Sequence, residues 1–209
     1  MRSVDLTFVP GAAGLGSFWD PVRRELPSEW RTRAFDLPGL GPVPAHADVQ
    51  SYSQLADYVA RQIERRTVLV GQSMGGYLAL DLTLRYPQLV SHLVLTVAAG
   101  GVDMARHGTR DWRLQARLDN PDRAEWTFAP TADLTAVLHR LRVPVLLIWA
   151  TNDPISPLGI AEELARQLPR ARLITFDSDD HWVVRVRAAE TAQVIRDFLL
   201  ESSASEQLD

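Results

Sequence analysis

The segment TVLVGQSMGGYLAL, residues 67–80, decides the fold of this 209-residue chain. Its β-branched apolar start predicts a buried strand, its GQSMG motif a sharp turn, and the residues from Met74 onward a helix. This arrangement would lift the Ser73 hydroxyl clear of the sheet edge, over the amide groups that begin the helix. Gly71 and Gly75 would leave room where the strand and the helix nearly touch. An ordinary glycine-rich turn between a strand and a helix is the alternative interpretation.

The composition indicates one soluble domain and excludes several kinds of chemistry. With 46% hydrophobic residues the chain can bury a sizeable core, and its net charge of −4 gives no reason to expect a nucleic acid or an anionic membrane as a partner. Cysteine is absent and all 22 basic residues are arginine, which excludes a thiolate nucleophile, a Schiff-base lysine and a Ser-Lys dyad. The sequence has no metal-ligand spacing, signal-peptide pattern or long apolar run. We therefore expect a cytoplasmic protein that needs no cofactor or metal.

Predicted strands and helices alternate along most of the chain. The strands are predicted at residues 4–9, 32–35, 67–70, 89–98, 143–149 and 172–176, and the helices near residues 17–26, 51–63, 74–86, 132–140, 158–168 and 181–200. This alternation predicts an α/β three-layer sandwich, in which right-handed crossovers join a mostly parallel sheet of about six strands. In this interpretation residues 1–200 are a single domain, residues 100–130 are a small cap insertion, and residues 201–209 are a disordered tail.

A serine nucleophile needs a base, and the base needs an acid to orient it. Among the five histidines, only His181 directly follows a strand at the edge where Ser73 is expected. Asp153 follows a buried strand at that edge and precedes Pro154, which suits a fixed carboxylate that accepts a bond from the imidazole. Asp103, just past another strand, is the rival acid. The alternatives are a capping or surface role for the histidine and simple turn chemistry for Asp153.

Two further groups of residues are candidates for substrate binding. Five aromatic side chains are candidate pocket linings, with core or cap packing as the alternative for each: Trp19, Trp112, Trp126, Phe128 and Trp182. Four arginines of the cap would share one face if residues 103–118 formed a helix: Arg106, Arg110, Arg113 and Arg117. Such a cationic face could dock an anionic substrate or an acidic carrier protein, and a solvated surface is the alternative.

Several motifs together resemble those of the α/β-hydrolase family over nearly the whole chain. The matching segments are FVPGAAG (8–14), DLPGLG (36–41), VGQSMGG (70–76), VPVLLIWATNDPISP (143–157) and DDHW (179–182). The order serine, aspartate, histidine also agrees with the order in that family. The resemblance implies the α/β-hydrolase fold with a reduced cap, and an oxyanion hole formed by the backbone N–H groups of Met74 and Ala12, with Ala13 as the alternative to Ala12.

The resemblance also implies a reaction. We expect a serine hydrolase that cleaves a small carboxylic ester or thioester through an acyl-enzyme on Ser73. A lyase or C–C hydrolase that uses the same triad, and a ligand-binding protein with a hydrolase-like pocket, are the alternatives. The chain departs from the family at Pro10, where the family usually has histidine, and at Asp180, where it usually has glycine.

Overall fold

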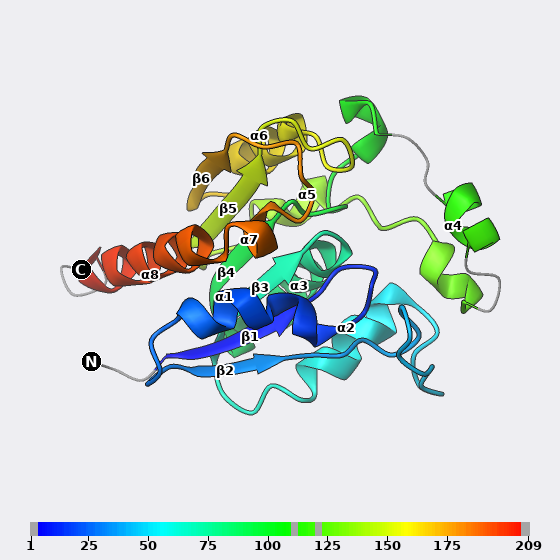
Figure 1. Cartoon of the computed structure of the whole chain (residues 1–209), viewed down its shortest axis with the longest axis horizontal. Coiled ribbons are helices and arrows are strands. Elements are labelled where there is room, and N and C mark those ends of the chain that lie inside the picture. Colours follow the sequence, from blue (N-terminus) through cyan, green and yellow to red (C-terminus); the bar gives the residue numbers. More distant parts are fainter. Residues whose placement is uncertain (1–3, 110–112, 120–122, 206–209) are drawn as a thin grey trace.

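A six-stranded sheet lies at the centre of the molecule, between two layers of helices (Figure 1). The computed structural model describes residues 4–109, 113–119 and 123–205. All neighbouring strands pair in parallel, in the order β2-β1-β3-β4-β5-β6. The predicted α/β class and strand number are therefore confirmed, and the sheet is parallel throughout.

The elements follow the predicted alternation. The strands are β1 (Asp5–Val9), β2 (Arg31–Ala34), β3 (Thr67–Gln72), β4 (Val90–Thr96), β5 (Val145–Ala150) and β6 (Ala171–Phe176). The α-helices are α1 (Asp20–Glu25), α2 (Tyr52–Ala60), α3 (Met74–Arg85), α4 (Arg113–Asp119), α5 (Thr135–Leu138), α6 (Leu158–Gln167), α7 (Val183–Val186) and α8 (Ala188–Ser205). The described residues also form short 3-10 helices: η1 (Gly16–Trp19), η2 (Pro87–Leu89), η3 (Met104–His107) and η4 (Glu125–Phe128). No helix in the described ranges combines the length and the apolar character needed to cross a bilayer.

The core lies along the central strands. Every residue of β3 and β5 is buried, whereas the edge strand β2 alternates between exposed and half-buried residues. This is the pattern of a parallel sheet that helices cover on both faces, because the inner strands then contact apolar side chains on either side. The continuous apolar runs of the sequence therefore become the central strands.

The connections place a switch in chain direction between β1 and β3. Helices α1, α7 and α8 cover the front face in Figure 1, and α2, α3, α5 and α6 lie behind the sheet. The chain leaves β1 toward one face and leaves β3 toward the other, so the topological switch point of the sheet lies between these two strands. Ligands of open parallel sheets bind at such a point.

Three predicted helices differ from the observed ones. The helix predicted at 132–140 is shorter in the structure, where only α5 is helical. It begins at Thr135, whose amide donates to the Asp133 carboxylate at 2.9 Å. The predicted 17–26 helix divides into η1 and α1, and the predicted 181–200 helix divides at Arg187 into α7 and α8. The tail predicted to start at residue 201 begins too early, because α8 continues to Ser205.

The described parts of the cap segment, residues 100–130, contain short helices only. Helix η3 ends at His107, the next residue Gly108 has a left-handed φ of +75°, and α4 is a separate helix, so a helix through residues 103–118, the condition for the common arginine face, is interrupted at Gly108. The common arginine face that depended on this helix is therefore lost. Arg106 instead pairs with Asp103 at 3.0 Å. Arg110 and the side chain of Arg113 lie outside the described residues.

Candidate active site

The Ser73 turn connects the end of β3 to the start of α3. Ser73 has φ +53° and ψ −124°, a backbone conformation that non-glycine residues rarely adopt. Neighbouring backbone holds it there: its N–H donates to Thr96 O at 3.0 Å, and its C=O accepts from the amides of Gly76 and Ala99, each at 2.9 Å. The strained turn is therefore fixed by the end of β4 as well as by its own helix.

The two glycines of the GQSMG motif each lie against backbone. A Cβ atom on Gly71 would approach Gly75 O to 2.3 Å, and one on Gly75 would approach Pro10 O to 2.2 Å. A side chain at either position would thus push β3 away from α3, or α3 away from the loop after β1. The spacing of the motif is a consequence of this close approach, which also brings the loop after β1 next to Ser73.

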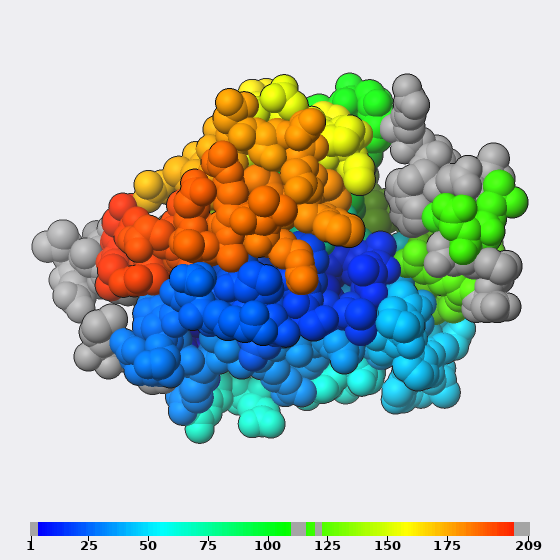
Figure 2. Space-filling model, viewed as in Figure 1, coloured from blue at the N-terminus to red at the C-terminus, as the bar shows by residue number. Residues whose placement is uncertain are grey.

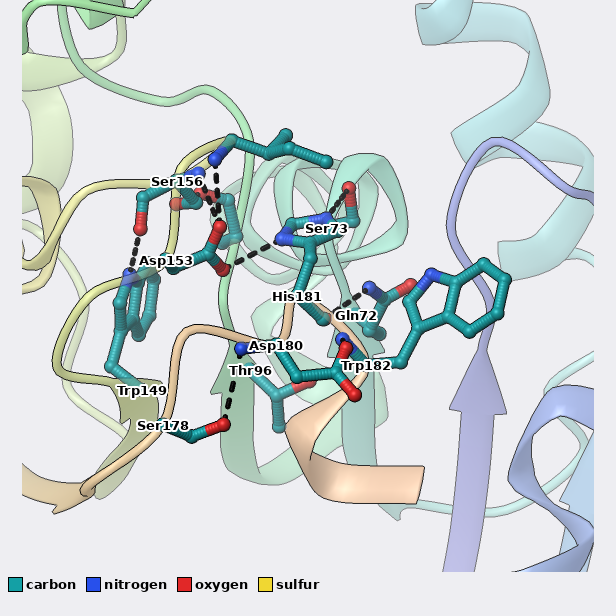
Figure 3. A network of polar contacts seen from close by, with 12 residues as sticks. Gln72, Ser73, Thr96, Trp149, Asp153, Ser156, Ser178, Asp180, His181 and Trp182 are labelled. Carbon is teal, nitrogen blue, oxygen red and sulfur yellow. Dashed lines mark hydrogen bonds and ion pairs between the residues drawn. The ribbon is translucent and has the colours of Figure 1, made fainter. Parts of the chain in front are cut away.

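Ser73, His181 and Asp153 are joined by hydrogen bonds (Figure 3). His181 Nε2 lies 2.9 Å from Ser73 Oγ, and His181 Nδ1 lies 2.7 Å from Asp153 Oδ2. The carboxylate can only accept, so Nδ1 carries the proton and Nε2 is left to accept from the hydroxyl. The Asp153 side chain is fully buried and that of His181 is 10% exposed, so the pair is shielded from water.

The loop that carries Asp153 uses both carboxylate oxygens. While Oδ2 faces His181, Oδ1 accepts from the amides of Ile155 at 2.8 Å and Ser156 at 2.9 Å. Ser156 is held in turn, because its Oγ donates to Ala98 O at 2.7 Å and its C=O accepts from Trp149 Nε1 at 2.9 Å. Turn chemistry and imidazole orientation, which the sequence offered as alternatives, therefore coexist in one side chain.

The rival carboxylate is occupied elsewhere. Asp103 caps η3 by accepting from the Ala105 amide at 3.1 Å, and it pairs with Arg106. The acid that contacts the His181 ring is Asp153. The negative charge of Asp180, beside the histidine in sequence, is also engaged, since its Oδ1 accepts from the Trp182 amide at 2.7 Å.

Sequence reasoning assigned no role to Gln72, the second residue of the motif. Its buried side chain donates from Nε2 to the backbone C=O of His181 at 3.4 Å (Figure 3). A Cβ on Gly11 would lie 2.4 Å from Gln72 Oε1, so the amide side chain fills the space between the loop after β1 and the loop that carries the histidine. A polar residue at a buried strand end was the available signal, but its partner is 109 positions away.

Backbone amides near Ser73 are free to bind an oxygen. A Cβ on Gly11 would lie 3.1 Å from Ser73 Cβ, so the loop that contains Ala12 and Ala13 borders the serine. Within the described residues no acceptor pairs with the N–H of Ala12, of Ala13 or of Met74, the first residue of α3. Helix starts leave such amides unsatisfied, and they carry partial positive charge.

The aromatic candidates lie in different environments. Trp19 is wrong as a pocket lining: it is fully buried in the core, with its ring centroid 5.2 Å from that of Phe8. Trp182 is 58% exposed beside His181, and Phe128 is buried in the cap segment. Trp112 lies outside the described residues.

Trp126 anchors the cap segment to the body of the molecule. Its ring lies against Gly39 and meets the ring of Tyr52 edge-on, with centroids 5.5 Å apart. Tyr52 also donates its hydroxyl proton to Thr127 O at 2.6 Å. In Figure 2 the green atoms of the cap segment accordingly lie against the dark-blue and light-blue atoms of the chain after β1 and β2. Within the described ranges, no three histidine or acidic side chains gather as a metal-binding group.

Comparison with known proteins agrees with the fold. The sequence pattern described as "Alpha/beta hydrolase family" matches residues 8–194, and the chain belongs to this family. A pimeloyl-[acyl-carrier protein] methyl ester esterase of Neisseria meningitidis serogroup A is 29% identical over 225 residues, covering 87% of this chain and 72% of the relative. The chain is thus an esterase-like α/β hydrolase.

Two further proteins are similar to this chain, one in sequence and one in fold. A 2-hydroxy-6-oxononadienedioate/2-hydroxy-6-oxononatrienedioate hydrolase of Paraburkholderia phymatum is 27% identical over 240 residues, covering 91% of this chain and 83% of the relative. The solved structure of a thermophilic esterase from Thermogutta terrifontis superposes with a TM-score of 0.79 at 22% identity, covering 96% of this chain and 90% of that one. The second likeness concerns the fold alone.

Proposed function

We propose that this protein is a serine hydrolase that cleaves a carboxylic ester or thioester through an acyl-enzyme on Ser73. The observation that carries the proposal is the unbroken set of hydrogen bonds from Ser73 Oγ through the His181 ring to Asp153. A hydroxyl is a poor nucleophile until a base removes its proton, and His181 Nε2 lies within reach of that proton.

The proposed reaction has two halves. His181 takes the hydroxyl proton as Ser73 Oγ attacks the carbonyl carbon, and Asp153 stabilises the imidazolium that forms. His181 then protonates the leaving alcohol or thiol. In the second half the same imidazole activates a water that releases the acid from Ser73.

The negative charge of the tetrahedral intermediate needs donors that are already in place. The free amides of Met74 and Ala12 are the proposed donors, with Ala13 as the alternative to Ala12, because these N–H groups border Ser73 and have no other partner among the described residues. Loss of one such donor typically costs about 3 kcal/mol of barrier.

The named relatives support an ester or thioester and leave a second candidate. The Neisseria relative is named as a methyl ester esterase of an acyl-carrier-protein substrate, which supports a carboxylic ester here. The Paraburkholderia relative is named as the hydrolase of a dienedioate, and this favours C–C hydrolysis by the same triad as the second candidate. The two candidates differ in the bond that is cleaved and share Ser73 as the central residue.

The test uses a fluorophosphonate probe and a short acyl ester of p-nitrophenol. Wild type should be labelled and should release p-nitrophenol in a burst, whereas Ser73→Ala should do neither while keeping its circular dichroism spectrum. Labelling of Ser73→Ala would contradict the assignment of the nucleophile. A folded wild type that binds the ester without any turnover would instead indicate a ligand-binding protein.

A further inference from the structure

Arg123 belongs to the cap segment and precedes η4. Its Nη2 donates to Ala12 O at 3.3 Å, and Ala12 belongs to the loop that borders Ser73. The Arg123 guanidinium therefore contacts the residue next to Gly11. Gly11 itself lies so close to the serine that a Cβ on it would be 3.1 Å from Ser73 Cβ. The anchoring of Trp126 and Thr127 by Tyr52 fixes the segment that carries it.

The guanidinium of Arg123 is short of partners. Its Nε is buried and has no hydrogen-bond acceptor among the described residues. Within the described part of the chain no carboxylate forms an ion pair with it, and its one hydrogen bond goes to a neutral carbonyl. Burial disfavours the charged form and holds the pKa of the Arg123 guanidinium below its usual value. A buried positive charge and a buried donor are both costly unless something pairs with them.

A second arginine of the cap segment shows what an ordinary surface arginine does there. Arg117 and Arg123 both place their guanidinium groups over the Phe128 ring, 5.1 and 5.6 Å from its centroid. Arg117 is 47% exposed and pairs with the carboxylate of Glu125. Arg123 lies next to the loop that borders Ser73 and lacks a carboxylate partner among the described residues. The two arginines therefore differ in whether their positive charge is paired, and an unpaired, partly buried charge is the one that a ligand can neutralise.

We propose that Arg123 binds a free carboxylate carried by the substrate of this hydrolase, so that the preferred ester is a monoanion. A guanidinium donates two parallel bonds to a carboxylate, and the unpaired Nε is one of the donors that such a fork uses. A singly charged carboxylate suits a partly buried site better than a phosphate dianion, because desolvation costs rise with charge. The inference rests on the proposed hydrolase function and specifies its substrate class.

The kinetic test compares esters that differ in one charge. Wild type and Arg123→Gln are assayed with p-nitrophenyl butyrate and with the p-nitrophenyl monoester of glutaric acid, which adds a carboxylate to the acyl chain. A second pair, the butyrate esters of phenol and of 4-hydroxybenzoate, adds the carboxylate to the leaving group instead. In one of the pairs, KM for the anionic ester should rise about tenfold or more in Arg123→Gln, while KM for its neutral partner stays within about threefold.

Two matched variants separate binding from structure. Arg117→Gln, on the same ring, should leave both esters of each pair within about threefold of wild type. Arg123→Lys keeps the charge and loses the fork, so its KM for the anionic ester should lie between those of wild type and Arg123→Gln. An equal fall in kcat with all esters would overturn the proposal, because it would mean that Arg123 only holds the Ala12 loop. Unchanged KM values would overturn it as well.

A binding measurement distinguishes failure of this inference from failure of the proposed function. Ser73→Ala is titrated calorimetrically with monomethyl glutarate and with dimethyl glutarate, with and without Arg123→Gln. Weaker binding of the monoacid alone on loss of Arg123 supports the carboxylate site even where no ester is turned over. Equal binding of both compounds to both proteins overturns the inference and leaves the hydrolase assignment intact.

Discussion

The loops of the triad and the docked part of the cap segment differ in how their polar groups are paired. In the acid loop, Asp153 bonds through both oxygens, and the indole N–H of Trp149 reaches Ser156 O. In the cap segment, the buried Nε of Arg123 and the buried Nε1 of Trp126 have no acceptor in the part of the chain that the structure describes. Groups that are paired in the free protein hold a geometry ready for chemistry, whereas unpaired donors leave their bonding capacity to a ligand.

The two regions also differ in the elements that carry them. Ser73 and Asp153 follow the carboxyl ends of the buried strands β3 and β5, and His181 follows the edge strand β6, so the sheet register sets the positions of their loops. The cap segment is built from 3-10 turns and a short helix, and its described part is held through side chains such as Tyr52. We infer that the triad loops determine the chemistry and that the cap segment determines which ester is used.

The largest effect should follow from removal of the base. His181→Ala leaves the serine without a proton acceptor, so kcat with p-nitrophenyl butyrate should fall by about 10⁴-fold or more. Steady-state kinetics at saturating ester gives the value, and the thermal midpoint reports whether the fold is kept. A fall of less than tenfold in a folded variant would mean that another group acts as the base.

Changing the acid should separate the two candidate carboxylates. Asp153→Asn puts an amide against the imidazole and favours the wrong tautomer, so kcat should fall by about 10³- to 10⁴-fold. Asp103→Asn, in the cap segment, should change kcat by less than about twofold because its partners are Ala105 and Arg106. The opposite ranking of the two variants would mean that Asp103, after β4, is the acid that orients the histidine.

A glycine in each region offers a matched comparison of stability. Gly75→Ala would force a Cβ to within 2.2 Å of Pro10 O, so we expect a loss of about 3 kcal/mol. Gly108→Ala meets no atom within 4 Å, and its cost should be about 1 kcal/mol from the left-handed backbone alone. Chemical denaturation of both variants measures the difference. Equal losses would show that the elbow can relax.

The smallest effect should come from the unpaired indole of the cap segment. Trp126→Phe removes a buried N–H without an acceptor, so stability should change by less than about 1 kcal/mol. Trp149→Phe removes a paired N–H and strands the carbonyl of Ser156, and it should cost about 2 kcal/mol or more. Thermal midpoints of the two variants give the comparison. A larger loss at Trp126 than at Trp149 would contradict the contrast between the regions.

Much of the fold could be predicted because its signals are local. Continuous apolar runs become central strands, and Ser51 caps α2 by accepting from the Gln54 amide at 3.2 Å. The arginine face that required a helix over residues 103–118 is not formed because a left-handed Gly108 interrupts that helix, and the spacing of the arginines does not register a change of backbone handedness. The end of α8 at Ser205 was missed because the polar composition after Leu200 predicted a disordered tail, and composition alone does not exclude a helix.

The sequence by itself determined the alternation of strands and helices, the serine turn and the order of serine, aspartate and histidine. These depend on consecutive residues, and in a parallel sheet every strand end falls at one edge, so the three side chains had to come near each other. Only the tertiary structure decided that Trp19 belongs to the core, that Gln72 bonds to the chain at His181, and that Arg123 is left without an anionic partner in the described chain. Each of these outcomes depends on which side chains from distant parts of the sequence contact one another, and those contacts are determined by the close packing of the whole molecule.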